Sequence, residues 1–396
     1  MPATTHSGMN VSAEPFALDE LAWLGFRVFN LAQNHATDYG PQGLVDTIDA
    51  LSERGLVFAG AGRSLSQARA PAYFEVDGCR VATIGVVTSN ADLARASDGS
   101  GLVAARPGIS PLRIHPDYRV DARLMQMIIE VDEALGTARA TSRRDLFGIF
   151  PNFFPRTNPG RRRFLNATFT QGDEPSFGWS VNDFDRKAVE QAIREADRMA
   201  DIVVVQLHSH EGPSGDWNCE EIPDFLVDVA HGFVDAGADV VIGHGPHRLR
   251  PVEVYRGKPI FYSLGNFIFM LETIGVLPPE FYEEQGFTKP ASPADVHDLW
   301  TKSTDGGANG FRTDSCYWES VLVTCTVESN GSLSSQLDPL ALGFELPRSQ
   351  AGVPRFTDIT EGKRILSDLA RASAERFDTR IEISEHAGTV KALLSP

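Results

Sequence analysis

Apolar and polar positions along the first part of the chain predict alternating strands and helices. Residues 26–32 and 56–62 are short apolar runs rich in β-forming residues. Between them, Leu44, Ile48 and Leu51 recur at the spacing of one helix face. The order strand, helix, strand is typical of an α/β unit.

The second half repeats this order and adds hairpins. We predict helices over residues 185–200, 222–237 and 361–377, buried strands over 201–208 and 238–244, and hairpins over 72–87, 251–269 and 320–340. Asp77-Gly78 supplies the two-residue turn of the first hairpin. Together these elements predict an α/β sandwich with mixed sheets and helices on the outside.

Two stretches interrupt this order. Residues 92–182 contain proline, glycine, phenylalanine and arginine in irregular order around one helical segment, and residues 273–315 are similarly irregular. We interpret both as insertions that shape a site within a single domain of residues 1–396. No repeat and no low-complexity segment marks a domain boundary.

Composition narrows the class of protein. The 396 residues are 42% hydrophobic and 22% charged, which is typical of a globular chain. No apolar run reaches the roughly 20 residues that span a bilayer, and the N-terminus has no signal-peptide pattern. Four cysteines without a CxxC pair are too few for a disulfide framework. We therefore expect a reduced, cytoplasmic protein without membrane insertion.

The net charge of −17 bears on partners. Because such an acidic surface repels phosphate backbones and anionic lipid head groups, we expect no general binding to nucleic acid or membranes. Positive charge concentrates locally at Arg156 and at Arg161, Arg162 and Arg163. The oligomeric state stays open.

Histidines are the main candidates for chemistry. Five of the ten fall in three short loops that follow apolar strands: His35, His208, His210, His244 and His247. The carboxyl ends of strands in an open α/β sheet are where ligands gather, and imidazole is a good ligand for several divalent metals. Each motif alone has a structural explanation as a turn or strand-end residue, but the three loops together favour a metal site.

Three stretches then indicate a family. Residues 31–78, 203–212 with "VVVQLHSHEG" and 237–269 with "GHGPH" and "YSLGNFIF" together resemble the CapA-like (poly-γ-glutamate capsule biosynthesis) family of the calcineurin-like metallophosphoesterase superfamily. The resemblance is close over residues 16–90 and 185–270. It implies a four-layer α/β/β/α sandwich with a dinuclear metal centre at the sheet edge.

The resemblance also implies which residues hold metal. Asn34 of "QNH", His208 and His244 would ligate the second metal ion, and His247 would ligate the first. The cofactor would be one or two divalent ions, with manganese, zinc, iron and calcium not distinguished.

Other roles follow from the same motifs. His35 would be the adjacent proton donor or oxyanion stabiliser, and His210 a catalytic or substrate-contacting residue. Asn266 would brace the metal shell from the second sphere.

One departure from the family pattern concerns the N-terminus. Family members begin with a Gly-Asp strand and an "NLE"-like motif that supply most ligands of the first metal. Met1 to Phe16 contains no equivalent, and Glu14 is a weak substitute. We therefore expect the fold to lack its first strand, through a start that is short relative to the family or through a site with one metal ion or none.

The implied chemistry is hydrolysis by metal-activated water. The family suggests an amide-linked, poly-γ-glutamate or peptide-like substrate, whose carboxylates Arg161, Arg162 and Arg163 would engage while Trp217 forms an apolar wall. Three alternatives stay open: a metal-dependent peptide epimerase, a phosphoesterase, and a non-catalytic component of capsule biosynthesis.

Overall fold

A six-stranded sheet forms the centre of the molecule, in a computed structural model that describes residues 9–140, 143, 160–165, 167–302, 307–328, 332–386 and 388–394. The strands lie in the order β13-β14-β12-β11-β5-β4. Four of them are parallel: β5 (Cys79–Val87), β11 (Ile202–His208), β12 (Val240–His244) and β14 (Lys258–Leu264). The edge strands β4 (Ala72–Val76) and β13 (Leu249–Tyr255) are antiparallel.

The turn between β4 and β5 confirms the predicted hairpin. Asp77 and Gly78 have φ of 50° and 81°. Positive φ at both central residues is the requirement of a type I′ turn, which glycine and aspartate tolerate best.

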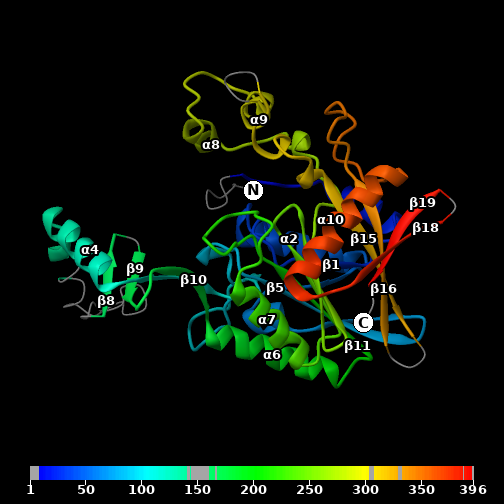
Figure 1. Cartoon of the computed structure of the whole chain (residues 1–396), viewed down its shortest axis with the longest axis horizontal. Helices are drawn as coiled ribbons and strands as arrows, with labels where there is room; N and C mark the ends of the chain where they lie inside the picture. The colour runs from blue at the N-terminus through cyan, green and yellow to red at the C-terminus, as the bar shows by residue number, and fades with distance from the viewer. Residues whose placement is uncertain are drawn as a thin grey trace.

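Helices α6 (Asp183–Asp197) and α7 (Asp224–Asp235) cover one face of the central sheet (Figure 1). Ile193 and Phe233 are fully buried there against strand residues such as Val205. This is the amphipathic packing that the spacing of apolar residues in both helices predicts.

A second sheet and one long helix cover the other face. The second sheet contains β15 (Glu319–Val327), β16 (Leu333–Ala341), β17 (Arg355–Phe356), β18 (Ile381–His386) and β19 (Thr389–Leu394). Helix α10 (Ile359–Phe377) contacts β13 as well as β16, β18 and β19. Leu337, Leu366 and Phe261 meet in the core between these layers. The predicted α/β sandwich is confirmed.

Short elements surround the carboxyl ends of the central strands. They are α1 (Phe16–Trp23), β1 (Val28–Asn30), α2 (Gly40–Glu53), β2 (Val57–Ala59), β3 (Ala61–Gly62), α3 (Leu65–Arg69), η1 (Asp92–Ala94) and β6 (Gly108–Ile109). Strands β1 and β2 pair in parallel as a separate two-stranded sheet, and β3 pairs with β6. Ala32, Leu44 and Ile109 form a small core beneath this region.

The described parts of residues 114–181 form an arm that extends from the body (Figure 1). It comprises β7 (Ile114–Val120), α4 (Ala122–Ala134), β8 (Arg161–Phe164), β9 (Ala167–Gln171) and β10 (Ser176–Val181). The first part of the predicted insertion, with η1 and β6, instead packs into the body. Residues 144–159 of that insertion lie outside the described residues.

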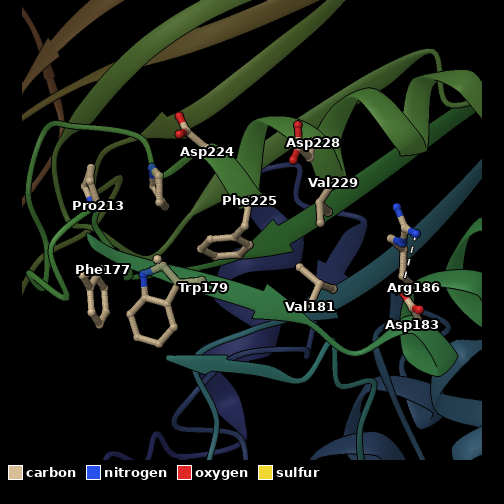
Figure 2. A pocket seen from close by; sticks show the side chains of 12 residues that line it. Phe177, Trp179, Val181, Asp183, Arg186, Pro213, Asp224, Phe225, Asp228 and Val229 are labelled. Atoms are coloured by element: carbon tan, nitrogen blue, oxygen red, sulfur yellow. Dashed lines mark ion pairs between the residues drawn. The ribbon is translucent and has the colours of Figure 1, made fainter. Parts of the chain in front are cut away.

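The root of the arm packs against the body. Figure 2 shows Phe177 and Trp179 of β10 facing Phe225 of α7 across a cavity of about 410 Å³. Trp179 Nε1–H donates to the carbonyl of Gly212 at 2.9 Å. This contact joins the arm to the loop that follows His210.

The second predicted insertion forms short helices above the strand ends: η2 (Leu271–Thr273), α8 (Pro279–Glu284), α9 (Pro293–Thr301), η3 (Gly310–Arg312) and η4 (Ser315–Trp318). Leu277, Phe281 and Val296 are buried among them. Residues 303–306 lie outside the described residues. Across the described ranges, no helix combines the length and apolar character needed to cross a membrane.

Candidate functional site

The strands β11 and β12 end on two histidines that lie side by side. His208 and His244 are register partners in the parallel pair, so both side chains emerge at the same edge of the sheet. Their Nδ1 atoms are 2.8 Å apart. The structure thus brings together two of the histidines that the sequence placed at strand ends, as parallel topology requires.

Asn30, the last residue of β1, sets the protonation of His244. Asn30 Oδ1 accepts the backbone N–H of Ala32 at 3.0 Å, so its Nδ2–H₂ faces His244 Nε2 at 2.9 Å. His244 Nε2 must therefore accept, and the ring proton lies on Nδ1. His244 Nδ1–H then donates to His208 Nδ1, and both nitrogens of His244 are engaged.

The other nitrogen of His208 meets two further donor atoms. His208 Nε2 lies 3.0 Å from Asn34 Oδ1 and 3.0 Å from His210 Nε2. Because His208 Nδ1 accepts from His244, the proton of His208 lies on Nε2 and points to this pair. Two imidazole nitrogens and one amide oxygen, from the two loops that follow β1 and β11, therefore lie together.

Three histidines share a second arrangement, in which Nδ1 contacts a side-chain oxygen. The pairs are His210 with Asn218 Oδ1 at 2.6 Å, His247 with Asn266 Oδ1 at 2.9 Å, and His35 with Asp38 Oδ2 at 2.8 Å. Each oxygen fixes the ring proton on Nδ1 and leaves Nε2 with its lone pair. Histidines that bind metal or move protons are oriented in this way.

The "GHGPH" turn places His247 by an unusual backbone conformation. His247 has φ of 60°, and Gly245 has φ of 127° with no room for a side chain against Ser209. Asn266 Nδ2 donates to the carbonyls of His247 and Tyr317 at 3.1 and 3.0 Å. These two carbonyls leave Asn266 Oδ1 as the atom that faces the His247 ring.

Burial keeps this cluster uncharged. Desolvation lowers the pKa of His210 to about 3, against the effect of its hydrogen bond to Asn218, and lowers the pKa of His244 to about 4. Desolvation, followed by the neighbouring histidines, holds the pKa of His208 well below its usual value, and desolvation also lowers the pKa of His247. Neutral imidazoles have the lone pairs that metal binding and proton transfer need.

The donors fit a divalent cation in type, because neutral imidazole and amide oxygen both bind such ions. Within the described ranges, no group of three or more His, Cys, Asp or Glu side chains is arranged to hold a metal ion. His210 and His244 contact opposite nitrogens of His208, so these three rings do not converge on one point. The third donor beside His208 and His210 is instead the amide of Asn34.

Carboxylates in the same loops have other partners. Glu211 is buried and accepts hydroxyl hydrogen bonds from Thr88, Ser89 and Ser209 at 2.7 to 2.8 Å. Arg250, which is fully buried, donates to the carbonyl of Glu211 at 2.9 Å. Glu211 thus supports the loop that carries His208 and His210.

Comparison with known proteins identifies the family. Residues 2–271 match the family model described as bacterial capsule synthesis protein PGA_cap. The chain belongs to this bacterial capsule synthesis family. The calcineurin-like sandwich that the resemblance implied fits this assignment.

Individual relatives are distant. The uncharacterized protein y4sH of Sinorhizobium fredii is 30% identical over 98% of this chain and 81% of its own length. The PGA biosynthesis protein CapA of Bacillus subtilis is 30% identical over 62% of this chain and 43% of its own length. A probable polyglutamine synthesis accessory protein of Mycobacterium tuberculosis is 28% identical over 62% of this chain and 46% of its own length.

The family's predicted ligand residues do not all share one position here. Asn34 Oδ1 and His210 Nε2 each lie 3.0 Å from His208 Nε2. His244 is turned to Asn30 and His208. The ring centroids of His247 and His210 are 5.5 Å apart, and Asn266 Oδ1 lies 2.9 Å from His247 Nδ1.

The residues predicted to contact substrate lie in two different parts of the structure. Trp217 stacks on His210, with ring centroids 4.6 Å apart and planes within 5°. Arg161, Arg162 and Arg163 lie in β8 at the far end of the arm (Figure 1), and Arg162 Nε donates to the buried carboxylate of Asp132 at 2.9 Å. The structure does not bring these arginines to the histidines.

Sequence reasoning missed four polar residues that orient the cluster: Asn10, Asn30, Asp38 and Asn218. Asn10 is buried and donates to the carbonyl of Asp38 at 2.8 Å, and the backbone N–H of Val11 donates to Asp38 Oδ2 at 2.8 Å. The N-terminal segment therefore supports the His35 loop, whereas Glu14 is exposed. The signals were the asparagine at the end of the first strand and the aspartate three residues after His35.

Proposed function

We propose that this member of the capsule synthesis family is a metal-dependent hydrolase that acts on an amide-linked, poly-γ-glutamate or peptide-like substrate. The observation that carries the proposal is the meeting of His208 Nε2, His210 Nε2 and Asn34 Oδ1, at 3.0 Å from His208 to each, among uncharged imidazoles. A divalent cation bound there would polarise the substrate carbonyl and lower the pKa of water.

Each residue has a stated task. Asn34 and His210 would hold the cation, and His208 would join them once the cation displaces its Nε2 proton, because a metal ligand must be deprotonated. The Nε2 lone pair of His247, which Asn266 orients, would be a further donor. Trp217, stacked on His210, limits the movement of that ring and shields it from water.

His35 would act on the leaving group. Its Nδ1–H is held by the buried carboxylate of Asp38, so Nε2 is the atom that exchanges a proton with substrate. Amide hydrolysis needs a proton on the leaving nitrogen. His35 Nε2 would take up the proton that the attacking water releases and deliver it to that nitrogen.

Metal stoichiometry and amide hydrolysis test the proposal together. The wild-type protein, supplied with manganese, zinc, iron and calcium in turn, should retain one or two equivalents by elemental analysis. It should also release amines from poly-γ-glutamate or γ-glutamyl peptides. A His208→Ala, His247→Ala double variant should lose both properties. His231→Ala is the matched control, because His231 of α7 pairs with Glu253 of β13, outside the cluster.

A non-catalytic role in capsule synthesis is the second candidate. The carboxylates of Asp38 and Glu211 bind His35 and the hydroxyl groups of Thr88 and Ser89. The side chains that remain to bind a cation therefore carry no negative charge, which favours this candidate. A wild-type protein that retains no cation and releases no amine would overturn the hydrolase proposal in favour of this one.

A further inference from the structure

A second cavity lies next to the histidine cluster, in the helical insertion of residues 271–318. Its volume is about 410 Å³, which is within the size range of small-molecule sites. Its walls are mainly aromatic and aliphatic: Met9, Leu271, Phe281, Trp300, Phe311 and Trp318. It is separate from the cavity at the root of the arm.

His297, on α9, lines this cavity and has no hydrogen-bond partner among the described residues. The residue is 7% exposed, and neither Nδ1 nor Nε2 contacts a donor or acceptor. Buried polar groups in proteins are nearly always paired, so an unpaired ring at a cavity wall calls for an explanation. A ligand atom that hydrogen-bonds to His297 would supply the missing partner.

The cavity borders the candidate site at Phe311. Phe311 forms part of its wall and packs edge-on against His247, with ring centroids 5.0 Å apart. Phe269 contacts both rings, at 5.5 Å from His247 and 5.1 Å from Phe311. A group in the cavity would therefore lie one side chain away from the His247 imidazole.

The lining also indicates which chemistry the cavity accepts. Arg312 is the cation at its wall, and its guanidinium lies over the Trp318 ring at 4.0 Å and donates to the carbonyl of Phe344 at 2.8 Å. The arginine run Arg161 to Arg163 is at the end of the arm. Aromatic walls with one hydrogen-bonding ring suit an apolar group better than a run of carboxylates.

We propose that this cavity binds an apolar, aromatic-sized group that carries a hydrogen-bonding atom for His297. On the amide substrate, this group would be a side chain for which the cavity is the subsite; this assignment rests on the proposed function. The substrate is then a peptide-like amide with an apolar side chain next to the scissile bond, and a plain polyglutamate lacks that group.

Binding of N-acetyl-phenylalanine methylamide to the full chain, measured by calorimetry, tests the cavity without requiring hydrolysis. The wild type should bind saturably. Gln285→Trp, which places a large ring in the cavity, should weaken binding at least tenfold. Glu284→Trp is the matched control, because Glu284 is exposed and does not line the cavity. Absence of saturable binding, or equal binding by Gln285→Trp, would overturn the proposal.

His297→Leu separates the ring's polar role from packing. The substitution should weaken binding of the probe at least fivefold. The melting temperature should stay unchanged or rise, because two unpaired buried nitrogens are removed. Full probe affinity in this variant would contradict the assigned hydrogen bond.

Turnover distinguishes the two proposals. If the probe binds as expected but no amide is hydrolysed, the proposed function fails and the binding cavity stands. If γ-glutamyl peptides with and without phenylalanine are hydrolysed with the same KM, and Gln285→Trp leaves that KM unchanged, the subsite fails and the hydrolase stands.

Discussion

Asn30 donates its side-chain N–H to His244 Nε2 at 2.9 Å, across 214 residues of sequence. The backbone N–H of Ala32 fixes the orientation of the Asn30 amide, so the direction of this hydrogen bond is determined. From it follow the Nδ1–H form of His244 and the Nε2–H form of His208. One amide thus sets the proton positions in two buried imidazoles.

The first prediction concerns these tautomers. In chelator-treated protein near neutral pH, ¹⁵N NMR should report the proton of His244 on Nδ1 and that of His208 on Nε2. Asn30→Asp replaces the donor by an acceptor, so the proton of His244 should move to Nε2. Asn182→Asp is the control, because Asn182 caps α6 and does not contact the histidines. An Nε2–H form of His244 in the wild type would contradict the assignment.

The second prediction concerns the space that Asn30 occupies. A Cβ at Gly85 would lie 2.1 Å from Asn30 Oδ1 and 2.8 Å from Gly60 Cα. Gly85→Ala should therefore lower the free energy of unfolding by about 1–3 kcal/mol in denaturant titrations, through overpacking. It should also displace Asn30 and weaken cation retention. Gly178→Ala, in a strand with nothing within 4 Å of the new Cβ, should change neither property. Equal stability of the two variants would show that Asn30 has room to move.

Hydrophobic patterning predicts the scaffold of this site well. The apolar runs that end at His208 and His244 became neighbouring parallel strands, and parallel strands deliver their carboxyl ends to one edge. The meeting of Asn34 with His208 does not follow from this rule, because β1 pairs with β2 in a separate sheet and the loop after β1 reaches the edge of the central sheet by packing.

The orienting amides were not predictable in this way. Asn30 and Asn218 acquire their roles from contacts to histidines in other loops, and a lone asparagine has no periodicity that reveals its partner. Arg162 illustrates the opposite error. A run of arginines suggests an anion site by charge alone, but pairing with Asp132 and the direction of the arm decide its position.

The third prediction concerns His35 and rests on the proposed hydrolase. Asp38→Asn removes the acceptor that fixes the proton on His35 Nδ1. The kcat for amide hydrolysis should fall by about 10²–10⁴-fold, the range for losing general acid–base catalysis. The amount of cation that the protein retains should stay the same, since Asp38 does not contact Asn34, His208 or His210 in the contacts described. Asp46→Asn is the control, because Asp46 pairs with exposed Gln42 on α2. Unchanged kcat would remove His35 from the chemistry.

The fourth prediction concerns a buried carboxylate that joins three elements. Asp185, at the start of α6, is 1% exposed and accepts from Arg113 Nε at 2.6 Å and from Arg69. Burial raises the pKa of Asp185, but the hydrogen bonds and charge of Arg113, with Arg69, outweigh it and hold the pKa below its usual value. The contribution to stability is thus present above the unfolded-state pKa and is lost as pH falls through the folded-state pKa.

Asp185→Asn should accordingly lower the free energy of unfolding by about 3–5 kcal/mol at pH 7, because it removes the buried counter-charge of the partly buried Arg69 and Arg113. Urea titrations should give the same difference at pH 7 and pH 5, and a smaller one below about pH 4, where the unfolded carboxyl takes up its proton. Asp183→Asn, at an exposed position two residues earlier in the same helix, should have little effect at any pH. A difference that changes between pH 5 and pH 8 would trace the stability to a histidine instead, since imidazole titrates in that window and a carboxylate held by arginine does not.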